Sequence, residues 1–315
     1  MLQRIHVRGF GCVRNAELGL TPLHALIGPN DSGKSTLLRA IQASHELLVP
    51  TGPGSISRHQ LPEGCEVVVE SELGVARAEG HRVLEGGTDV FLGLGKRPAT
   101  LVAFDPYELL KPSPLIPESE LNRFMTSRGF GLAGIYQSIL SQGDETFLRI
   151  TEEVRRLFPT VKSLRLPAIN PQTVILRAEL TDGTQVNADQ MSHGLLYYLA
   201  FRALQFVSST KVFLIEEPEN GLHPARIRAV VAILRALAST AGNQVILTTH
   251  SPLVINELQP EEVSLCVRRT TAEGTRVVRL MDTPSFEKRS RVYALGELWL
   301  AYADGELEAP LLGET

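Results

Sequence analysis

The first forty residues alternate between apolar and polar side chains and then change to a helical spacing. Residues 2–8 and 16–20 alternate roughly one by one, which predicts two strands that each bury one face. Residues 23–27 are largely apolar and predict a third strand. Apolar residues then recur at helical spacing from Leu37 to Ile41. The beginning of the chain therefore predicts three strands followed by a helix.

The middle of the chain has shorter and more varied segments. Residues 49–61 are rich in Pro, Gly and Ser, which predicts a loop. We expect short strands at 66–70, 90–92, 100–104, 173–180 and 184–186, and helices at 118–125, 132–140 and 146–158. Asp182-Gly183 separates the last two strands and is a hairpin signal. Residues 49–184 are thus expected to form an inserted subdomain of strands and helices.

Helices and strands alternate again after residue 190. The pattern predicts helices at 192–208, 224–239 and 288–303, strands at 211–216 and 244–249, and a hairpin of 262–268 with 275–281. We therefore expect one α/β domain over 1–315, with 1–48 and 185–285 as its core and 286–315 as a C-terminal helix and tail. That last helix carries an apolar cluster, which could pack on the domain or dock a partner: Tyr293, Leu295, Leu298, Trp299 and Tyr302.

Composition narrows the class of protein only a little. Hydrophobic residues make up 43% and charged residues 21% of the 315, as in ordinary globular proteins. The net charge of −4 argues against a uniformly basic nucleic-acid-binding surface. Cys12, Cys65 and Cys266 are odd in number and far apart, so we expect reduced thiols and no disulfide framework. No signal peptide or membrane-spanning run is apparent, so the expected location is cytoplasmic.

The residues after the third predicted strand fit the phosphate-binding pattern G-x-x-x-x-G-K-[ST]. They are Gly28, Pro29, Asn30, Asp31, Ser32, Gly33, Lys34, Ser35 and Thr36. The two glycines let main-chain N–H groups and the positive end of the following helix face an anion. Lys34 supplies charge to the β- and γ-phosphates of a nucleotide, and the Ser35 hydroxyl is placed to bind Mg²⁺. The strand–loop–helix setting predicts an ATP site.

Two later strands end in residues that complete such a site. The apolar run 211–216 ends in Glu216 and Glu217, at the end of a strand where open α/β sheets bind ligands. We expect Glu216 to hold Mg²⁺, through water, and Glu217 to act as general base on the attacking water. His250 follows the next strand and could contact the γ-phosphate. The predicted catalytic residues are Lys34, Glu217 and His250.

These motifs, in this order, resemble those of the ABC-type ATPases. The sequences E-E-P-E-N-G-L-H-P at 216–224 and T-T-H-S-P at 248–252 are most similar to the corresponding motifs of AAA-family ATPases. These ATPases are related to the overcoming-lysogenisation-defect (OLD) nucleases and to RecF and SMC heads. The resemblance implies an α/β P-loop NTPase fold with an ABC-type mixed sheet, an antiparallel β subdomain at the N-terminus and an inserted α+β region. The resemblance is to the ATPase part of the OLD proteins; it covers the first forty residues and about 185–258 strongly and the middle weakly, and we expect no nuclease domain before Thr315.

The resemblance also implies a shared site in a head-to-tail homodimer. Ser192, His193 and Gly194 match the signature motif, which binds the γ-phosphate of ATP held by the other subunit, and 220–223 match a loop at that interface. His193 is bulkier than the usual middle residue, and Glu216 stands where aspartate is usual. Gln60 and Gln137 are both open as the family's glutamine loop. Phe10 and Arg14 lie where related ATPases approach adenine, although a core role for Phe10 is equally open.

The implied function is an ATP-hydrolysing switch that closes and reopens with ATP and Mg²⁺. By resemblance its work concerns DNA, in anti-phage defence or DNA repair, with a separately encoded effector such as a nuclease and no membrane. Two alternatives stay open: the motor subunit of a membrane transporter, and a module that binds ATP without hydrolysing it. DNA is also open as a partner for the basic side chains of 105–165, although interleaved acids favour a solvated face.

Overall fold

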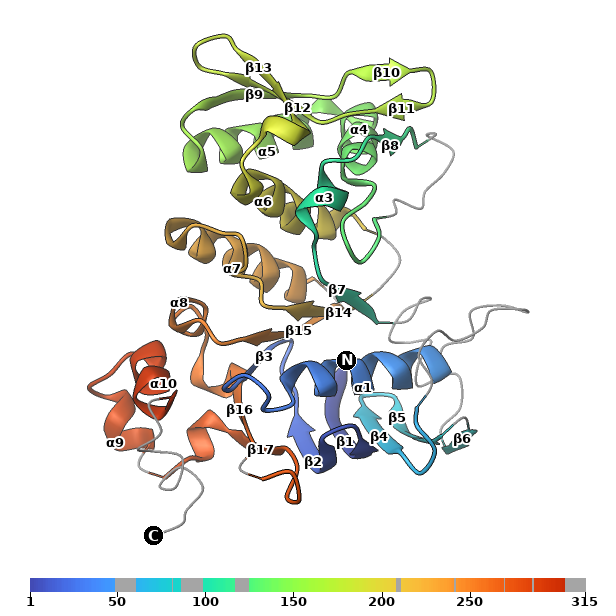
Figure 1. Ribbon diagram of the computed structural model, residues 1–315, viewed down its shortest axis with the longest axis vertical. Helices are drawn as coiled ribbons and strands as arrows, with labels where there is room; N and C mark the ends of the chain where they lie inside the picture. The colour runs from blue at the N-terminus through green and yellow to red at the C-terminus, as the bar shows by residue number, and fades with distance from the viewer. Residues whose placement is uncertain are drawn as a thin grey trace. The chain divides into compact units, whose positions relative to one another are not determined.

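The computed structural model describes residues 1–48, 61–80, 82–85, 99–116, 125–207, 211–240, 242–268, 270–284 and 286–303, and these form two compact units (Figure 1). The first unit comprises Met1–Leu101, Thr210–Glu219 and Leu234–Thr315, and the second comprises Val102–Ser209 and Asn220–Ile233. This division differs from the expected boundaries at 48/49 and 184/185. The strands before residue 101 join the N-terminal core, whereas the helix after Ser192 belongs to the second unit.

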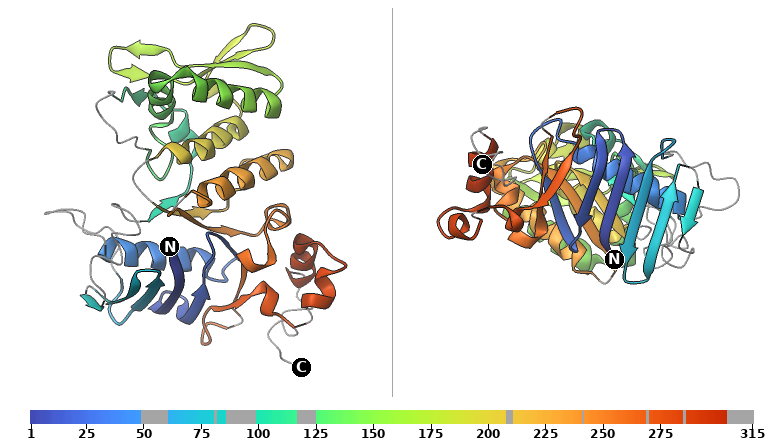
Figure 2. Two further views of the ribbon diagram at one scale, coloured as in Figure 1. Left: turned by 180° about the vertical axis from the view of Figure 1, so that it is seen from behind. Right: turned by 90° about the horizontal axis from the view of Figure 1, so that it is seen from below.

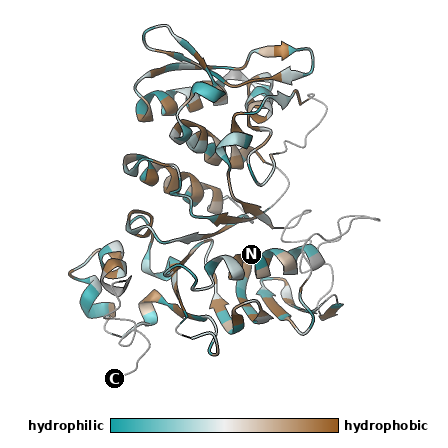
Figure 3. Ribbon diagram, in the orientation of Figure 1, coloured by the Kyte–Doolittle hydropathy of each residue, from teal (hydrophilic) through white to brown (hydrophobic). Residues whose placement is uncertain are grey.

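The first unit is built on a mainly parallel sheet with the order β17-β16-β3-β15-β14-β7. The strands are β3 (Leu23–Ile27), β7 (Thr100–Val102), β14 (Val212–Glu216), β15 (Gln244–Thr249), β16 (Val263–Val267) and β17 (Arg276–Arg279). Strands β3, β14, β15 and β16 are parallel, and β17 returns antiparallel to β16. Every residue of β3, β15 and β16 is buried, which explains their near-continuous apolar runs (Figure 3).

An antiparallel sheet adds the second layer of the first unit. Its order is β2-β1-β4-β5-β6, with β1 (Leu2–Phe10), β2 (Val13–Gly19), β4 (Glu66–Ser71), β5 (Gly74–Glu79) and β6 (Arg82–Glu85) side by side (Figure 2). Helix α1 (Lys34–Leu48) contributes Leu37, Leu38 and Ile41 to the core that the inward faces of these strands enclose. Helices α8 (Pro252–Ile255), α9 (Phe286–Ser290) and α10 (Leu295–Ala303) complete this unit.

The second unit is helical with two small antiparallel sheets. Its helices are α3 (Pro106–Leu109), α4 (Leu132–Gln142), α5 (Asp144–Leu157) and α6 (His193–Ala203); α7 (Pro224–Ala238) begins in this unit and ends in the first. One sheet joins β9 (Val161–Arg165), β12 (Arg177–Leu180) and β13 (Gln185–Asn187), and the other β8 (Ser113–Pro114), β10 (Ala168–Asn170) and β11 (Thr173–Val174). The buried Tyr136 hydroxyl on α4 donates to the Leu199 carbonyl on α6 at 2.9 Å, and this bond ties the helices together.

The structure confirms the predicted α/β fold class and most of the elements. Three predictions need correction. The strand expected at 173–180 is interrupted, because the Ile175 amide bonds the Pro167 carbonyl instead of a ladder partner. The helix expected at 192–208 ends at Ala203, followed by a 3₁₀ turn at 204–206. The helix expected at 288–303 is two helices, because the Arg289 carbonyl accepts from both Val292 and Tyr293 and a new helix starts after Ala294.

Several predicted segments lie wholly or almost wholly outside the described residues. They are the loop at 49–61, the strand at 90–92 and the helix at 118–125. Among the described residues, no helix combines the length and apolar character that crossing a membrane requires. Cys12, Cys65 and Cys266 are free thiols.

We predict that the His24→Gln variant loses less stability than the wild type when the pH is lowered. His24 is fully buried in β3, where its Nε2 lies 3.0 Å from Ser264 Oγ, and burial, assisted by the Arg279 charge, lowers its pKa from 6.5 to about 3. Between these two values the unfolded chain binds a proton that the folded chain excludes, so stability falls as pH falls. One such group contributes a slope of about 1.4 kcal/mol per pH unit. The free energy of unfolding, measured with urea from about pH 6 to about pH 4, should fall less steeply in the variant, by this contribution. Equal slopes in variant and wild type would show that His24 is not the group responsible.

We also predict that Gln244→Leu destabilises the first unit. The buried Gln244 side chain accepts from the Leu2 amide at 3.0 Å and donates to the Leu2 carbonyl at 2.8 Å and the Thr21 carbonyl at 3.1 Å. Leucine leaves these main-chain groups without partners, so the free energy of unfolding should fall by about 3 kcal/mol. Gln3→Leu, at an exposed position of β1, is the matched control and should change it by less than about 0.5 kcal/mol in the same chemical denaturation.

Candidate functional site

The loop between β3 and α1 packs too tightly for side chains at its two glycines. Gly28 and Gly33 have φ values of +157° and +95°. A Cβ atom on Gly28 would lie 2.3 Å from the Cys266 carbonyl oxygen, and one on Gly33 would lie 2.2 Å from Thr275 Oγ1. The loop therefore rests directly on the end of β16 and on the turn before β17.

Lys34 is folded into this loop. It is 7% exposed, and its Nζ donates to the main-chain carbonyls of Gly28 and Pro29, both at 2.8 Å. Burial lowers the pKa of Lys34, and nearby anionic groups, Glu217 and Glu219 among them, oppose that shift. The ammonium group thus has two carbonyl partners that phosphate oxygens could replace.

Asp31 makes a contact that the sequence pattern did not reveal. It adopts a left-handed backbone with φ of +66°, which is uncommon outside glycine, and its side chain is 91% exposed. Its Oδ1 lies 3.4 Å from Nη1 of Arg268, the residue that follows β16. The β16–β3 pairing brings this arginine to the loop, and no local motif marks it.

Strands β14 and β15 carry buried oxygen atoms that have no hydrogen-bond partner in the described structure. They are Oε1 of Glu216 and Oγ1 of Thr248, which are register neighbours, and Ser32 Oγ in the loop shares this property. An unpartnered buried polar group costs about 1–3 kcal/mol, so a bound ligand or water is the expected partner. Within the described ranges, no three His, Cys, Asp or Glu side chains gather where they could hold a metal. A cation at Glu216 would therefore depend on a phosphate, on water and on a hydroxyl such as that of Ser35, and the donors present fit Mg²⁺ in this role.

Glu217 is held in a strained conformation next to His250. Its φ is +46°, and its amide donates to the Thr248 carbonyl at 2.9 Å, which continues the β14–β15 ladder. His250 Nδ1 lies 3.2 Å from Glu217 Oε1. The Glu217 side chain is 31% exposed and the His250 side chain 48% exposed, so a water molecule and a ligand can reach both. Strained residues of this kind cluster at functional sites.

Glu219 is a further member of this site, and its place in the E-E-P-E motif did not by itself assign it a role. Its Oε1 accepts from Thr249 Oγ1 at 2.6 Å and from the His250 amide at 3.4 Å, while its buried Oε2 is among the atoms left unpartnered in the described structure. The indole Nε1 of Trp299 donates to the His250 carbonyl at 3.0 Å. The backbone of His250 is thus bonded on both sides, and the expectation that Trp299 packs back on the domain is the one the structure supports.

The predicted signature residues lie at the N-terminus of α6 in the second unit. Ser192 caps the helix, since its Oγ accepts from the Leu195 amide at 3.3 Å, and both Ser192 and His193 are exposed. A Cβ atom on Gly194 would lie 3.6 Å from the Gly221 carbonyl, which brings the 220–223 loop to this helix end. Gly221 has φ of +74°, and Tyr197 fills the space where a side chain would stand. The N-terminus of a helix is the kind of place where main-chain N–H groups bind anions.

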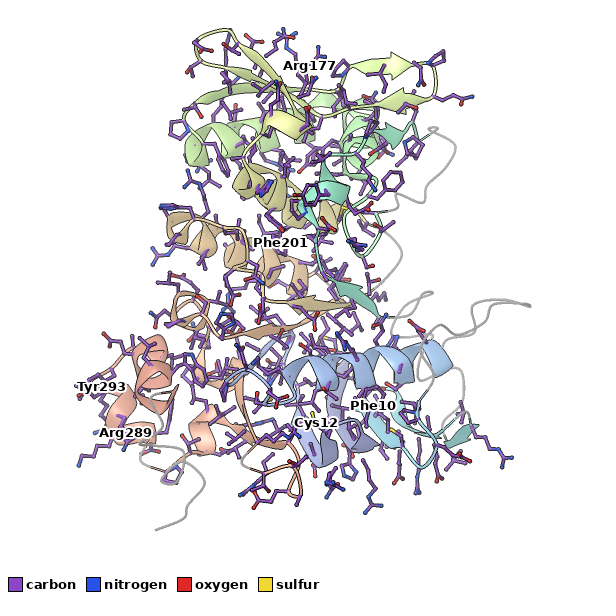
Figure 4. The ribbon with its side chains drawn as sticks, viewed as in Figure 1. Phe10, Cys12, Arg177, Phe201, Arg289 and Tyr293 are labelled. Carbon is purple, nitrogen blue, oxygen red and sulfur yellow. The ribbon has the colours of Figure 1, made fainter. Side chains whose placement is uncertain are left out.

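The structure also shows the contacts of residues for which the sequence left more than one role open. Phe10 packs partly buried against the core, close to Cys12, whose Sγ lies 3.4 Å from Thr36 Oγ1 on α1 (Figure 4). Arg14 donates to the Thr271 carbonyl at 3.4 Å. Gln137 lies on α4, where its amide reaches Ser141 Oγ, and Gln60 lies outside the described residues. Several basic side chains of the middle region pair with acids, as a solvated face would: Lys111, Arg128, Lys162 and Arg165.

Two family models match parts of this chain. A family model described as "AAA domain, putative AbiEii toxin, Type IV TA system" matches residues 115–256, and one described as "AAA ATPase domain" matches residues 1–45. The OLD nuclease of Thermus scotoductus is 25% identical over 322 residues, which cover 80% of this chain and 59% of that protein. The chain thus spans less than two thirds of the length of this curated relative.

Two solved structures share the fold. An SMC head bound to the C-winged helix domain of ScpA has a TM-score of 0.59 at 15% identity, over 88% of this chain and 96% of that one. An SMC head with an extended coiled coil, bound to the C-terminal domain of ScpA derived from Pyrococcus furiosus, has a TM-score of 0.56 at 14% identity, over 92% and 98%. These similarities confirm the resemblance drawn from the motifs: the chain is similar to AAA-family ATPase domains and to the OLD nuclease of Thermus scotoductus, and it shares its fold with SMC heads.

Proposed function

We propose that this chain binds ATP with Mg²⁺, hydrolyses it, and acts as a switch that dimerises around the nucleotide. One observation carries the proposal. The phosphate-type loop with its buried lysine, the Glu216–Glu217 pair and His250 all follow parallel strands of one sheet, and buried oxygen atoms there have no partner within the described structure. A nucleotide polyphosphate and its cation would satisfy those atoms.

In this proposal the loop binds the phosphates through its backbone and Lys34. The ammonium group exchanges the carbonyls of Gly28 and Pro29 for β- and γ-phosphate oxygens. Bound Mg²⁺, held by Ser35 and through water by Glu216, would neutralise charge that develops on these phosphates. The loop thereby orients the γ-phosphate in line with an attacking water.

Glu217 and His250 act on the other side of the γ-phosphate. Glu217 accepts the proton of the attacking water, and its accessible carboxylate, fixed by the backbone bond to Thr248, is suited to that role. His250, 3.2 Å from Glu217, orients the carboxylate and donates to the γ-phosphate. Asp31 and Arg268 border the same loop and are proposed to adjust its conformation rather than take part in the chemistry.

The second unit supplies the surface for dimerisation. The N-terminus of α6, capped by Ser192, would meet the γ-phosphate bound by another copy of the chain, with His193 and Gly194 beside it. The curated relative is named an OLD nuclease, so we propose that opening and closing of this dimer controls a nucleolytic effector in a DNA-related process such as anti-phage defence or repair.

Glu217→Gln should bind ATP normally but lose hydrolysis by about a hundredfold or more, because the amide cannot accept the water's proton. The closed dimer should then accumulate with ATP and Mg²⁺. Calorimetric titration, phosphate release and size-exclusion chromatography measure the three effects. Glu261→Gln, at an exposed position of the same unit, is the control and should behave as the wild type. Turnover near the wild-type rate in Glu217→Gln would show that another residue is the base.

Complementation between two inactive variants tests the shared site. Ser192→Arg should block closure by bulk and charge while ATP still binds, and Lys34→Ala should lose ATP binding. A mixture should recover hydrolysis to at most about half, because one of the two interfaces in the mixed dimer keeps an intact loop and an intact signature. Phosphate release measured over mixing ratios checks this. Wild-type hydrolysis by Ser192→Arg alone, as a monomer, would exclude the head-to-tail arrangement.

A further inference from the structure

We propose that Trp299 on helix α10 is a positioning residue for His250, so that this C-terminal helix sets the geometry of the γ-phosphate site; this rests on the proposed ATPase function. Trp299 is the chain's single tryptophan and is 4% exposed. Its indole Nε1 donates to the main-chain carbonyl of His250 at 3.0 Å. The contact joins positions 49 residues apart and ends on the backbone of the residue that faces Glu217.

Helix α10 is fastened to the segment that follows His250. The Gly296 amide donates to Asn256 Oδ1 at 2.7 Å. A Cβ atom on Gly296 would lie only 2.3 Å from the Pro252 carbonyl oxygen and 2.8 Å from Asn256 Oδ1. The backbone of α10 therefore touches α8 directly, and the helix holds the chain at His250 and again at 252–256.

The opposite side of His250 is fixed by Glu219. Its Oε1 accepts from the His250 amide at 3.4 Å and from Thr249 Oγ1 at 2.6 Å. With the amide held by Glu219 and the carbonyl by Trp299, the backbone of His250 has little freedom. Its imidazole stays 48% exposed and within 3.2 Å of Glu217. A rigid backbone under an accessible side chain is what preorganised catalysis requires.

The first test separates positioning from binding. Trp299→Phe keeps an aromatic ring but removes the N–H donor, and we expect kcat for ATP to fall by about tenfold while the calorimetric Kd for ATP changes by less than about twofold. Gly296→Ala should lower kcat in the same direction, since it forces α10 away from Pro252. Leu300→Ala, on the same helix at a side chain that is 51% exposed, is the control and should leave both constants unchanged.

The second test uses the tryptophan as its own reporter and leaves Trp299 itself unchanged. In Glu217→Gln protein with Mg²⁺, ATP should shift the fluorescence of Trp299, whereas ADP, which lacks the γ-phosphate, should shift it much less. His250→Ala should remove the difference between the two nucleotides. Equal responses to ATP and ADP, or wild-type kcat in folded Trp299→Phe, would overturn the proposal. Absence of ATP binding by calorimetry in wild-type protein would instead overturn the proposed function itself.

Discussion

Parallel pairing of β15 with β3 on one side and β14 on the other is the constraint from which the site follows. In this register Ile27, the last residue before the phosphate-type loop, lies opposite Thr249, and Glu216 lies opposite Thr248. Parallel strands end at the same edge of a sheet. The loop, the acidic pair and His250 therefore come together although they are far apart in the sequence. A slip of one residue would turn these side chains toward the wrong face, and complete burial of β3 and β15 resists such a slip.

The same edge of the sheet concentrates local strain and unsatisfied polarity. Asp31 and Glu217 are the non-glycine residues of the described chain with positive φ, and both border the site. Glu216, Glu219, Thr248 and Ser32 each keep a buried oxygen without a partner in the described structure. Together such features cost several kcal/mol, about 1–3 for each, and they persist only where the surrounding core fixes the backbone. A ligand that satisfied them would stabilise the fold and bind at the same time.

In the proposed reaction, the two units would supply different residues. The first unit carries the phosphate-type loop, the acids and His250, and the second carries the capped N-terminus of α6. Neither unit has the complete set of residues that the proposed reaction needs. Hydrolysis would therefore depend on bringing the N-terminus of α6 from one copy of the chain to the phosphate-type loop of another copy. The proposed switch follows from this requirement, because conditions that favour or oppose closure would then control turnover.

The sequence by itself determined the local features of this protein. The strand–loop–helix at 23–48, the acids after β14 and the histidine after β15 could be identified because each is a short segment whose residue types follow from its own chemistry. Only the tertiary structure decided the contact of Glu219 with Thr249, the approach of Arg268 to Asp31 and the bond from Trp299 to His250. It also decided that 61–85 joins the N-terminal core and that the last helix breaks near Ala294. All of these features depend on contacts between residues that are distant in the sequence. Packing and strand register select the partners, and the periodicity within one segment does not encode that selection.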